Sequence, residues 1–345
     1  MITEVFNIEH PIFAIPSPLY ATAELVAGAS EAGALGVFPA YFQKPEEIRE
    51  TVSTIRKLTK KTFGILLVPP QKKKANPKLA RYVVEALRPI RESYHLPEPN
   101  LEIPSFDEQF QTVLDLEVPV VGNCLGGFRE PYMEALEEKG VLSFGIASNL
   151  RDAKVLESTG VQAVISKGWE SSGLISNSEV PDRDACIGSE VLREECLRAL
   201  RTPILFDTAL HSHQKVKTFL GEGCQGLVLS DALIGADETG LPRDWLELLR
   251  YTTDGSSTVT NLTYGHPARV LRNQLINELE EAEFQALPFP QQWFLMKDIF
   301  EKAKVSERLQ DYPLDFGQLG YQFPVGPIQK IINEYASLTK ENAHE

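Results

Sequence analysis

The sequence predicts a (β/α)8 barrel with a helical segment behind it. Short apolar runs of the kind found in buried parallel strands alternate with amphipathic helical patterns. Eight such strand-helix units fit into roughly the first 245 residues, the size of one barrel of this class. The full length of 345 residues leaves room for an appendage. These observations favour a closed barrel over an open, doubly wound sheet.

The expected strands are short, and each ends where a polar or glycine-containing loop begins. The residues expected near their carboxyl ends are Ile15, Phe38, Val68, Val121, Phe144, Ser166, Phe206 and Leu229. The expected strands are Pro11–Ile15, Val37–Phe38, Phe63–Val68, Val118–Val121, Val141–Phe144, Val161–Ser166, Pro203–Phe206 and Leu227–Leu229.

Helix starts are marked by capping residues. Thr22 precedes a run with apolar residues on one face, Pro45 stands where a first-turn proline is tolerated, and Asn149 with Asp152 resembles a capping box. A Lys- and Pro-rich insertion is expected around residues 69–103 of a barrel that spans 1–255. Residues 256–345 are expected to form a helical appendage packed on the barrel, with helices at Pro267–Ala282, Gln291–Ala303 and Pro327–Leu338.

Composition narrows the class of function. The formal charge of -14 disfavours nucleic acid as a partner, because a polyanion would be repelled. The four cysteines have no Cys-x-x-Cys pair, which argues against a zinc site and for a reducing compartment. No signal-peptide pattern and no membrane-length apolar run is visible, so a cytoplasmic protein without a membrane partner is expected.

Polar residues follow several expected strands at the end where barrels of this class place their ligands. Glu170 follows Lys167-Gly168 and is a candidate base, although loop glutamates are often only solvated. Asp207 and Asp231 follow the last two strands and either face a cation or cap the next helices. The other candidates are the histidines His211 and His213, which are either a displaced base or surface residues, and the pocket residues Asn123, Cys124, Ser171 and Ser172.

The order of motifs resembles the nitronate monooxygenase (2-nitropropane dioxygenase) family over almost the whole chain. The matching stretches are Ala32–Gly36, Phe63–Leu67, Gly168–Gly173, Gly265–Arg269 and Gly317-Gln318. The resemblance implies a barrel that uses FMN to oxidise a small organic substrate. It places the cofactor against Pro16, Ser17, Leu66, Lys167, Gly168, Asp207, Thr208, Ser230 and Asp231.

The chain departs from the family at the cofactor and the base. Leu174 replaces the catalytic histidine of the Gly-x-Glu-Ala-Gly-Gly-His motif, while Ser17 and Leu66 replace the family's Met and Asn. Asp207–Leu210 stands in place of Ala-Gly-Gly-Ile and Ser230–Leu233 in place of Gly-Thr-Arg-Phe, the glycine-rich loops that hold the FMN phosphate. Phosphate sites use bare amides, so we expect these two aspartates to weaken FMN binding.

Two functions follow from these observations. The first, and favoured, is an FMN-dependent oxidoreductase that abstracts a proton from a small organic substrate and reduces the flavin, with the base moved to Glu170, His211 or His213. The second is a flavin-free barrel that has lost this activity and either binds a small cationic or metal-linked ligand or acts as a non-catalytic partner. The sequence allows a homo-oligomer and does not define the substrate.

Overall fold

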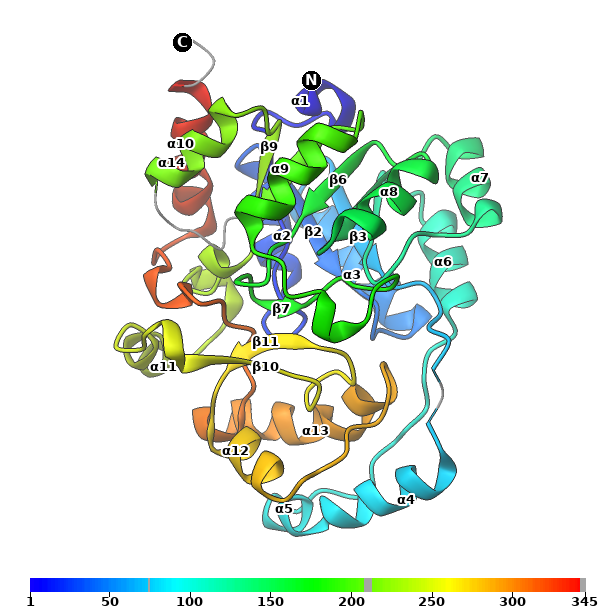
Figure 1. Ribbon diagram of the computed structural model, residues 1–345, viewed down its shortest axis with the longest axis vertical. Helices are drawn as coiled ribbons and strands as arrows, with labels where there is room; N and C mark the ends of the chain where they lie inside the picture. Colours follow the sequence, from blue (N-terminus) through cyan, green and yellow to red (C-terminus); the bar gives the residue numbers. More distant parts are fainter. Residues whose placement is uncertain (74, 208–212, 342–345) are drawn as a thin grey trace.

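Eight parallel strands close into a barrel in the computed structural model, which describes the chain except residues 74, 208–212 and 342–345 (Figure 1). The prediction of a (β/α)8 barrel is confirmed. The barrel closes where β1 pairs on one side with β2, Phe13 opposite Leu35, and on the other with β9, Phe13 opposite Val228. The strands are β1 (Ile12–Ala14), β2 (Leu35–Pro39), β3 (Phe63–Leu67), β4 (Val120–Asn123), β5 (Leu142–Ala147), β6 (Ala163–Ser166), β8 (Ile204–Asp207) and β9 (Gly226–Leu229).

The helices around the barrel begin at the capping residues that the sequence marks. The Thr22 hydroxyl accepts the N–H of Leu25 at 3.0 Å, and the Asn149 side chain accepts the N–H of Asp152 at 2.9 Å. Four helices, α1, α6, α9 and α11, were not predicted from the pattern. The helices are α1 (Ile2–Phe6), α2 (Ala23–Glu31), α3 (Pro45–Leu58), α6 (Phe106–Asp115), α7 (Glu130–Glu138), α8 (Leu150–Ser158), α9 (Ser189–Ala199), α10 (His213–Gly221) and α11 (Arg243–Leu249).

The insertion contains helices α4 (Pro77–Ala86) and α5 (Arg88–Ser93), which lie beside the C-terminal segment (Figure 1). Arg91, which is buried, forms an ion pair of 2.9 Å with Asp298. Tyr94 donates its hydroxyl to Asp311 at 2.5 Å. The insertion is therefore fastened to the segment that follows the barrel.

The C-terminal segment contains strands as well as helices. The prediction of a helix over Pro267–Ala282 was wrong in its first part, because Ala268–Leu271 forms strand β11. β11 lies between β10 (Ser257–Thr260) and β7 (Gly173–Leu174) in a three-stranded antiparallel sheet. The helices of this segment are α12 (Gln274–Glu281), α13 (Gln291–Val305) and α14 (Ile328–Glu341).

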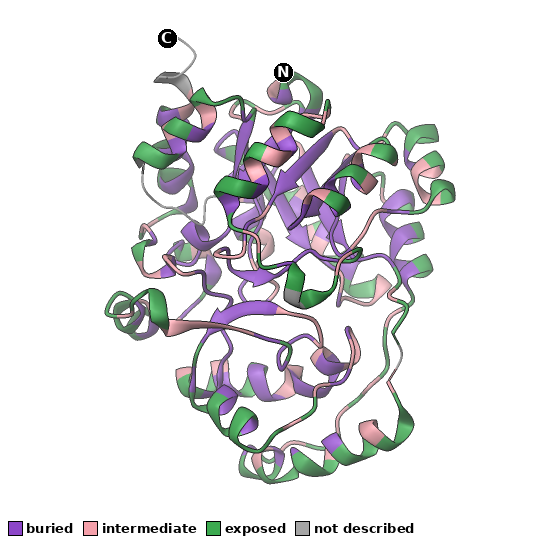
Figure 2. Cartoon of the chain, viewed as in Figure 1, coloured by how far each residue is buried: buried purple, intermediate pink, exposed green. Residues whose placement is uncertain are grey.

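The pattern of burial is that of a barrel with an inner ring of strands and an outer ring of helices. The barrel strands are buried along nearly their whole length, whereas the helices bury one side and expose the other (Figure 2). Rings from separate elements stack where the C-terminal segment meets the barrel, as with Phe42 and Trp293, whose centroids lie 4.3 Å apart. Within the described residues, no helix has both the length and the apolar composition that crossing a membrane requires.

Candidate functional site

A small cavity of about 60 Å³ lies at the carboxyl ends of the barrel strands. The loops after β1, β2, β4, β6 and β9 contribute to its wall, together with residues at the carboxyl ends of β2, β3 and β5. It therefore occupies the end of the barrel at which enzymes of this fold place their active sites. Seven of the residues singled out in the sequence line it: Pro16, Ser17, Leu66, Cys124, Lys167, Ser172 and Ser230.

Asp315, a residue that the sequence analysis missed, lines the same cavity. Its side chain is buried, and its Oδ2 accepts hydrogen bonds from the Ser17 hydroxyl at 2.6 Å and the Tyr264 hydroxyl at 2.9 Å. Burial raises the pKa of Asp315 to about 6, although the two hydroxyls and Lys167 act in the opposite direction. Gly173 leaves room for this carboxyl, since a Cβ there would lie 2.8 Å from Oδ2.

Two further buried carboxyls, Asp207 and Asp231, lie at the carboxyl ends of β8 and β9. Asp207 accepts the Ser230 hydroxyl at 2.7 Å, and Asp231 accepts the N–H of Gly317 at 3.3 Å. Burial raises the pKa of Asp207, and burial together with the nearby Asp207 raises the pKa of Asp231 to about 7. Asp231 begins the short 3-10 turn η2 (Asp231–Leu233), but its side chain does not cap that turn.

Lys167 is the cation of this mouth. It follows β6 directly and lines the cavity, and its charge lowers the pKa values of Asp207, Asp231 and Asp315. No described residue forms an ion pair with its ammonium group. The three aspartates interact with the Lys167 charge without forming an ion pair with it. The ammonium group of Lys167 can therefore stabilise an anion formed in the cavity.

Glu170 lies next to the mouth, but its carboxylate faces helix α9. Its Oε1 accepts the N–H of Ser189 at 3.0 Å, and the Ser189 hydroxyl also donates to Oε1. Ser189 is the first residue of α9, so the carboxylate meets the positive end of the helix dipole. This arrangement favours a capping role over the role of a base.

Two of the remaining predicted residues, Gly168 and Asn123, do not line the cavity. Gly168 accepts the N–H of Ser171 at 3.1 Å in the turn after β6, and Asn123 donates its side-chain amide to Phe144 O at 3.3 Å. Leu174, at the position of the family's histidine, lines the cavity and offers no polar atom. Thr208 and His211 lie outside the described residues, and His213 begins α10.

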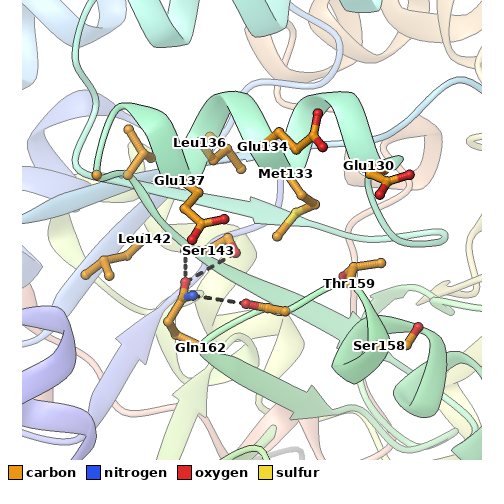
Figure 3. A pocket seen from close by; sticks show the side chains of 13 residues that line it. Glu130, Met133, Glu134, Leu136, Glu137, Leu142, Ser143, Ser158, Thr159 and Gln162 are labelled. Atoms are coloured by element: carbon orange, nitrogen blue, oxygen red, sulfur yellow. Dashed lines mark hydrogen bonds between the residues drawn. The ribbon is translucent and has the colours of Figure 1, made fainter.

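A larger hollow of about 810 Å³ lies at the opposite, amino-terminal ends of β5 and β6 (Figure 3). Its wall carries Glu130, Glu134 and Glu137 along α7, while Gln162 ties the strands together by accepting the N–H of Ser143 at 2.6 Å. This end of the fold serves stability in barrels of this class. Within the described part of the chain, no group of three or more His, Cys, Asp or Glu residues is placed to hold a metal ion.

Comparison with known proteins supports the assignment that the motifs imply. The family model of nitronate monooxygenase matches residues 1–336. The chain belongs to the nitronate monooxygenase family. Among curated members, a probable nitronate monooxygenase of Staphylococcus haemolyticus is 26% identical over 314 residues, which covers 88% of this chain and 86% of that protein. One from Staphylococcus saprophyticus is 23% identical over 294 residues, which covers 84% and 83% of the two chains.

The barrel and its C-terminal segment also resemble a solved structure of similar architecture. A nitroalkane oxidase from Streptomyces ansochromogenes superimposes with a TM-score of 0.88, and 99% of each chain is covered. Its sequence identity to this chain is 22%. The likeness therefore concerns the fold of this nitronate monooxygenase family member, including the segment that carries Asp315.

Among the described residues, those on the phosphate side of this mouth do not fit the phosphate of FMN. The phosphate of such a group carries close to two negative charges near pH 7. In this chain the Ser230 hydroxyl and the Gly317 amide, donors that can hold a phosphate, already donate to Asp207 and Asp231. The cavity of about 60 Å³ is also far smaller than the several hundred Å³ of typical cofactor pockets.

Proposed function

We propose that this protein is an oxidoreductase of the nitronate monooxygenase type, which removes a carbon-bound proton from a small organic substrate at the barrel mouth. The family match over residues 1–336 supports the reaction type. The observation that carries the proposal is the cavity in which Lys167 lies beside buried acidic groups. A proton acceptor and a fixed cation are the two groups that ionisation of a carbon acid requires.

The size of the cavity supports a small substrate. A hollow of about 60 Å³ holds only a few atoms, and its apolar wall comes from residues such as Leu66, Ile146 and Leu174. A nitroalkane or its nitronate fits this description, with an alkyl part for the apolar wall and oxygens for Lys167. The flavin that the family resemblance implies would be the electron acceptor when bound, and the phosphate side disfavours its FMN form.

Oxygen consumption tests this function directly. Full-length protein is supplied with nitroethane, 2-nitropropane and their nitronates, with FMN or riboflavin added in excess. We expect turnover that falls about 100-fold or more in Lys167→Met, because the anion loses its fixed counter-charge. A staphylococcal relative assayed in parallel is the positive control, and no turnover by this protein while the relative is active would overturn the proposal.

A second function is favoured by one specific observation. The buried carboxyls Asp207, Asp231 and Asp315 surround a mouth that does not fit a phosphate, which suits a flavin-free barrel that binds a small cation. The visible spectrum of the protein after incubation with riboflavin and gel filtration separates the two. A retained flavin band supports the oxidoreductase, whereas a colourless protein that binds methylammonium in calorimetry supports the cation-binding barrel.

A further inference from the structure

Asp315 reaches the barrel mouth from the far end of the chain. It pairs with Val270 of β11 in an isolated antiparallel bridge, which fixes its backbone next to the three-stranded sheet. Its side chain is 3% exposed and lines the cavity. It therefore shares one small space with Lys167, although nothing in the spacing of the sequence joins the two residues.

The two oxygens of Asp315 have different surroundings. Oδ2 accepts both hydrogen bonds, from Ser17 and Tyr264, whereas Oδ1 has no hydrogen-bond partner among the described residues. Buried polar atoms in folded proteins are nearly always paired, so an unpaired carboxyl oxygen beside a cavity calls for an explanation. A carboxyl that is oriented by hydrogen bonds to one oxygen, while its other oxygen has no partner, keeps the capacity to accept a proton from a molecule bound in the cavity that it lines.

The other acid and base groups around the mouth are less suited to that task. Glu170 is engaged by Ser189, and Asp207 and Asp231 accept hydrogen bonds outside the cavity wall. Cys124 lines the cavity, but burial raises the pKa of its thiol to about 12, so it is neutral near pH 7. Among the described groups, Asp315 is the acceptor that the cavity offers.

We propose that Asp315 is the general base of this barrel and takes the proton from a small carbon acid held against Lys167. The proposal rests on the proposed function and names the residue that performs its first step. The C–H bond of the substrate breaks, its electron pair stays on the substrate as a delocalised anion next to Lys167, and an O–H bond forms on Oδ1 of Asp315. With a nitroalkane the anion is the nitronate, and this step needs no oxidant.

The charge state of Asp315 supports this role. With a pKa of about 6, the carboxyl is largely ionised at pH 7 yet remains a stronger base than an exposed aspartate. The titratable groups that face it are Lys167 and the hydroxyls of Tyr20, Tyr41, Tyr264 and Tyr312. The pKa values of these tyrosines are raised by burial, so Asp315 and Lys167 set the charge of the cavity near pH 6.

Hydrogen-deuterium exchange at carbon tests the step without any cofactor. Nitroethane in deuterated buffer is followed by proton NMR, with and without the full-length protein. We expect the wild type to accelerate loss of the α-proton signal above the buffer rate, and Asp315→Asn to lower this acceleration about 100-fold or more. The matched control is Asp311→Asn, four residues earlier, where another buried aspartate accepts a tyrosine hydroxyl away from the cavity; it should exchange at the wild-type rate.

The pH profile provides a second measurement that a purely structural role would not move. The wild-type exchange rate should rise to a plateau with a midpoint near pH 6. Ser17→Ala removes a hydrogen bond that lowers the pKa of Asp315, so its midpoint should move to higher pH, while Asp311→Asn should leave the midpoint in place. This result does not depend on whether Asp315→Asn folds.

The possible results distinguish a wrong assignment of Asp315 as the base from a wrong proposed function. Exchange that survives Asp315→Asn in a folded protein, or a midpoint that Ser17→Ala leaves unchanged, overturns the role of Asp315. If the wild type also consumes oxygen with the same substrates, only the base is misassigned. If the wild type neither exchanges nor oxidises them, the proposed function fails together with its base. Loss of exchange in Glu170→Gln but not in Asp315→Asn would give the role to Glu170.

Discussion

The two sides of the barrel mouth differ in how their polar groups are used. On the side of β3, β4 and β6, the wall of the cavity carries Lys167 without an ion-pair partner among the described residues. On the side of β8 and β9, two described donors already meet carboxyls: the Ser230 hydroxyl donates to Asp207, and the amide of Gly317 donates to Asp231. Among the described residues, the first side offers an unpaired cation to a ligand, whereas the second uses these two donors within the protein.

This difference lies where the chain departs from the family motifs. Resemblance to the family places a phosphate on the β8 and β9 side, where this chain has buried two acids. A carboxylate about 4 Å from a phosphate charge costs on the order of 4 kcal/mol per charge pair at an effective dielectric near 20. We therefore expect the β8 and β9 side to weaken the binding of a charged cofactor tail, while the chemistry at Lys167 does not depend on that side.

The largest expected effect concerns the loss of folding stability caused by the buried Asp231 carboxylate on the β9 side. The pKa of Asp231 is about 7 in the folded protein against 3.8 for an ordinary aspartate, so the folded state holds an extra proton between these values. The stability linked to this proton is present below pH 4 and is lost as the pH rises through 7. Asp231→Asn should therefore raise the free energy of unfolding at pH 8 by on the order of 4 kcal/mol, with no gain at pH 4.

Urea unfolding at the two pH values measures this effect. Asp311→Asn, which removes a buried carboxylate paired with Arg308, should show no such gain at pH 8. If the difference in unfolding free energy between Asp231→Asn and the wild type is the same at pH 4 and pH 8, folding does not raise the pKa of Asp231.

The next effect is on cofactor binding. The double variant Asp207→Gly with Asp231→Thr should bind FMN roughly 10- to 100-fold more tightly than the wild type, because two carboxylates leave the phosphate side. Riboflavin, which lacks the phosphate, is the control and should show little change. Fluorescence titration decides between the cases: tight FMN binding by the wild type that the double variant does not improve would mean that the aspartates leave the phosphate site free.

A smaller effect concerns the close packing of Gly317 against Asp231 on the β9 side of the mouth. A Cβ on Gly317 would lie 2.1 Å from Oδ2 of Asp231 and 2.9 Å from the backbone oxygen of Glu170. Gly317→Ala should lower the free energy of unfolding by about 2 kcal/mol, and by less in an Asp231→Gly background. Gly221→Ala is the control, since a Cβ there meets open space. Equal costs of Gly317→Ala in both backgrounds would contradict this packing.

The smallest effect is at Glu170, between the two sides. Glu170→Gln should lower the free energy of unfolding by about 1 kcal/mol, because helix α9 loses the negative charge at its first turn. Thermal unfolding in low and high salt measures the loss, which should shrink in high salt as the charge is screened. A variant as stable as the wild type would show that the carboxylate does not serve as a cap.

The sequence predicted those parts of the fold that depend on local patterns. Strand runs and the caps Thr22 and Asn149 are local signals, and the closed barrel follows from their number and spacing. The wrong helix at Ala268–Leu271 arose because Ala268, Leu271 and Leu275 also fit a helical repeat. Its pairing with β7, far away in the sequence, made it a strand, and Asn273 then caps α12 by accepting the N–H of Ile276 at 2.9 Å.

The sequence predicted those residues of the candidate site that lie in the loops after the barrel strands. Lys167 and Ser230 were found because each directly follows a strand, and Ser172 because it lies in the loop that Lys167 begins; all three line the cavity. Asp315 has no strand of the barrel before it, so its position depends on tertiary contacts with Ser17 and Tyr264. The adjacent Gly317-Gln318 motif was the one local signal near it. The roles proposed for Glu170, His211 and His213 remain predictions.

The hydrogen bond between Ser17 and Asp315 spans 298 positions of the chain. During synthesis on the ribosome, the eight strands of the barrel emerge well before Asp315 does, so the barrel can form while its mouth still lacks this carboxyl. Loop closure over such a distance is among the slower events of folding. The order of synthesis therefore delays the completion of the mouth until the last part of the chain has left the ribosome and docked.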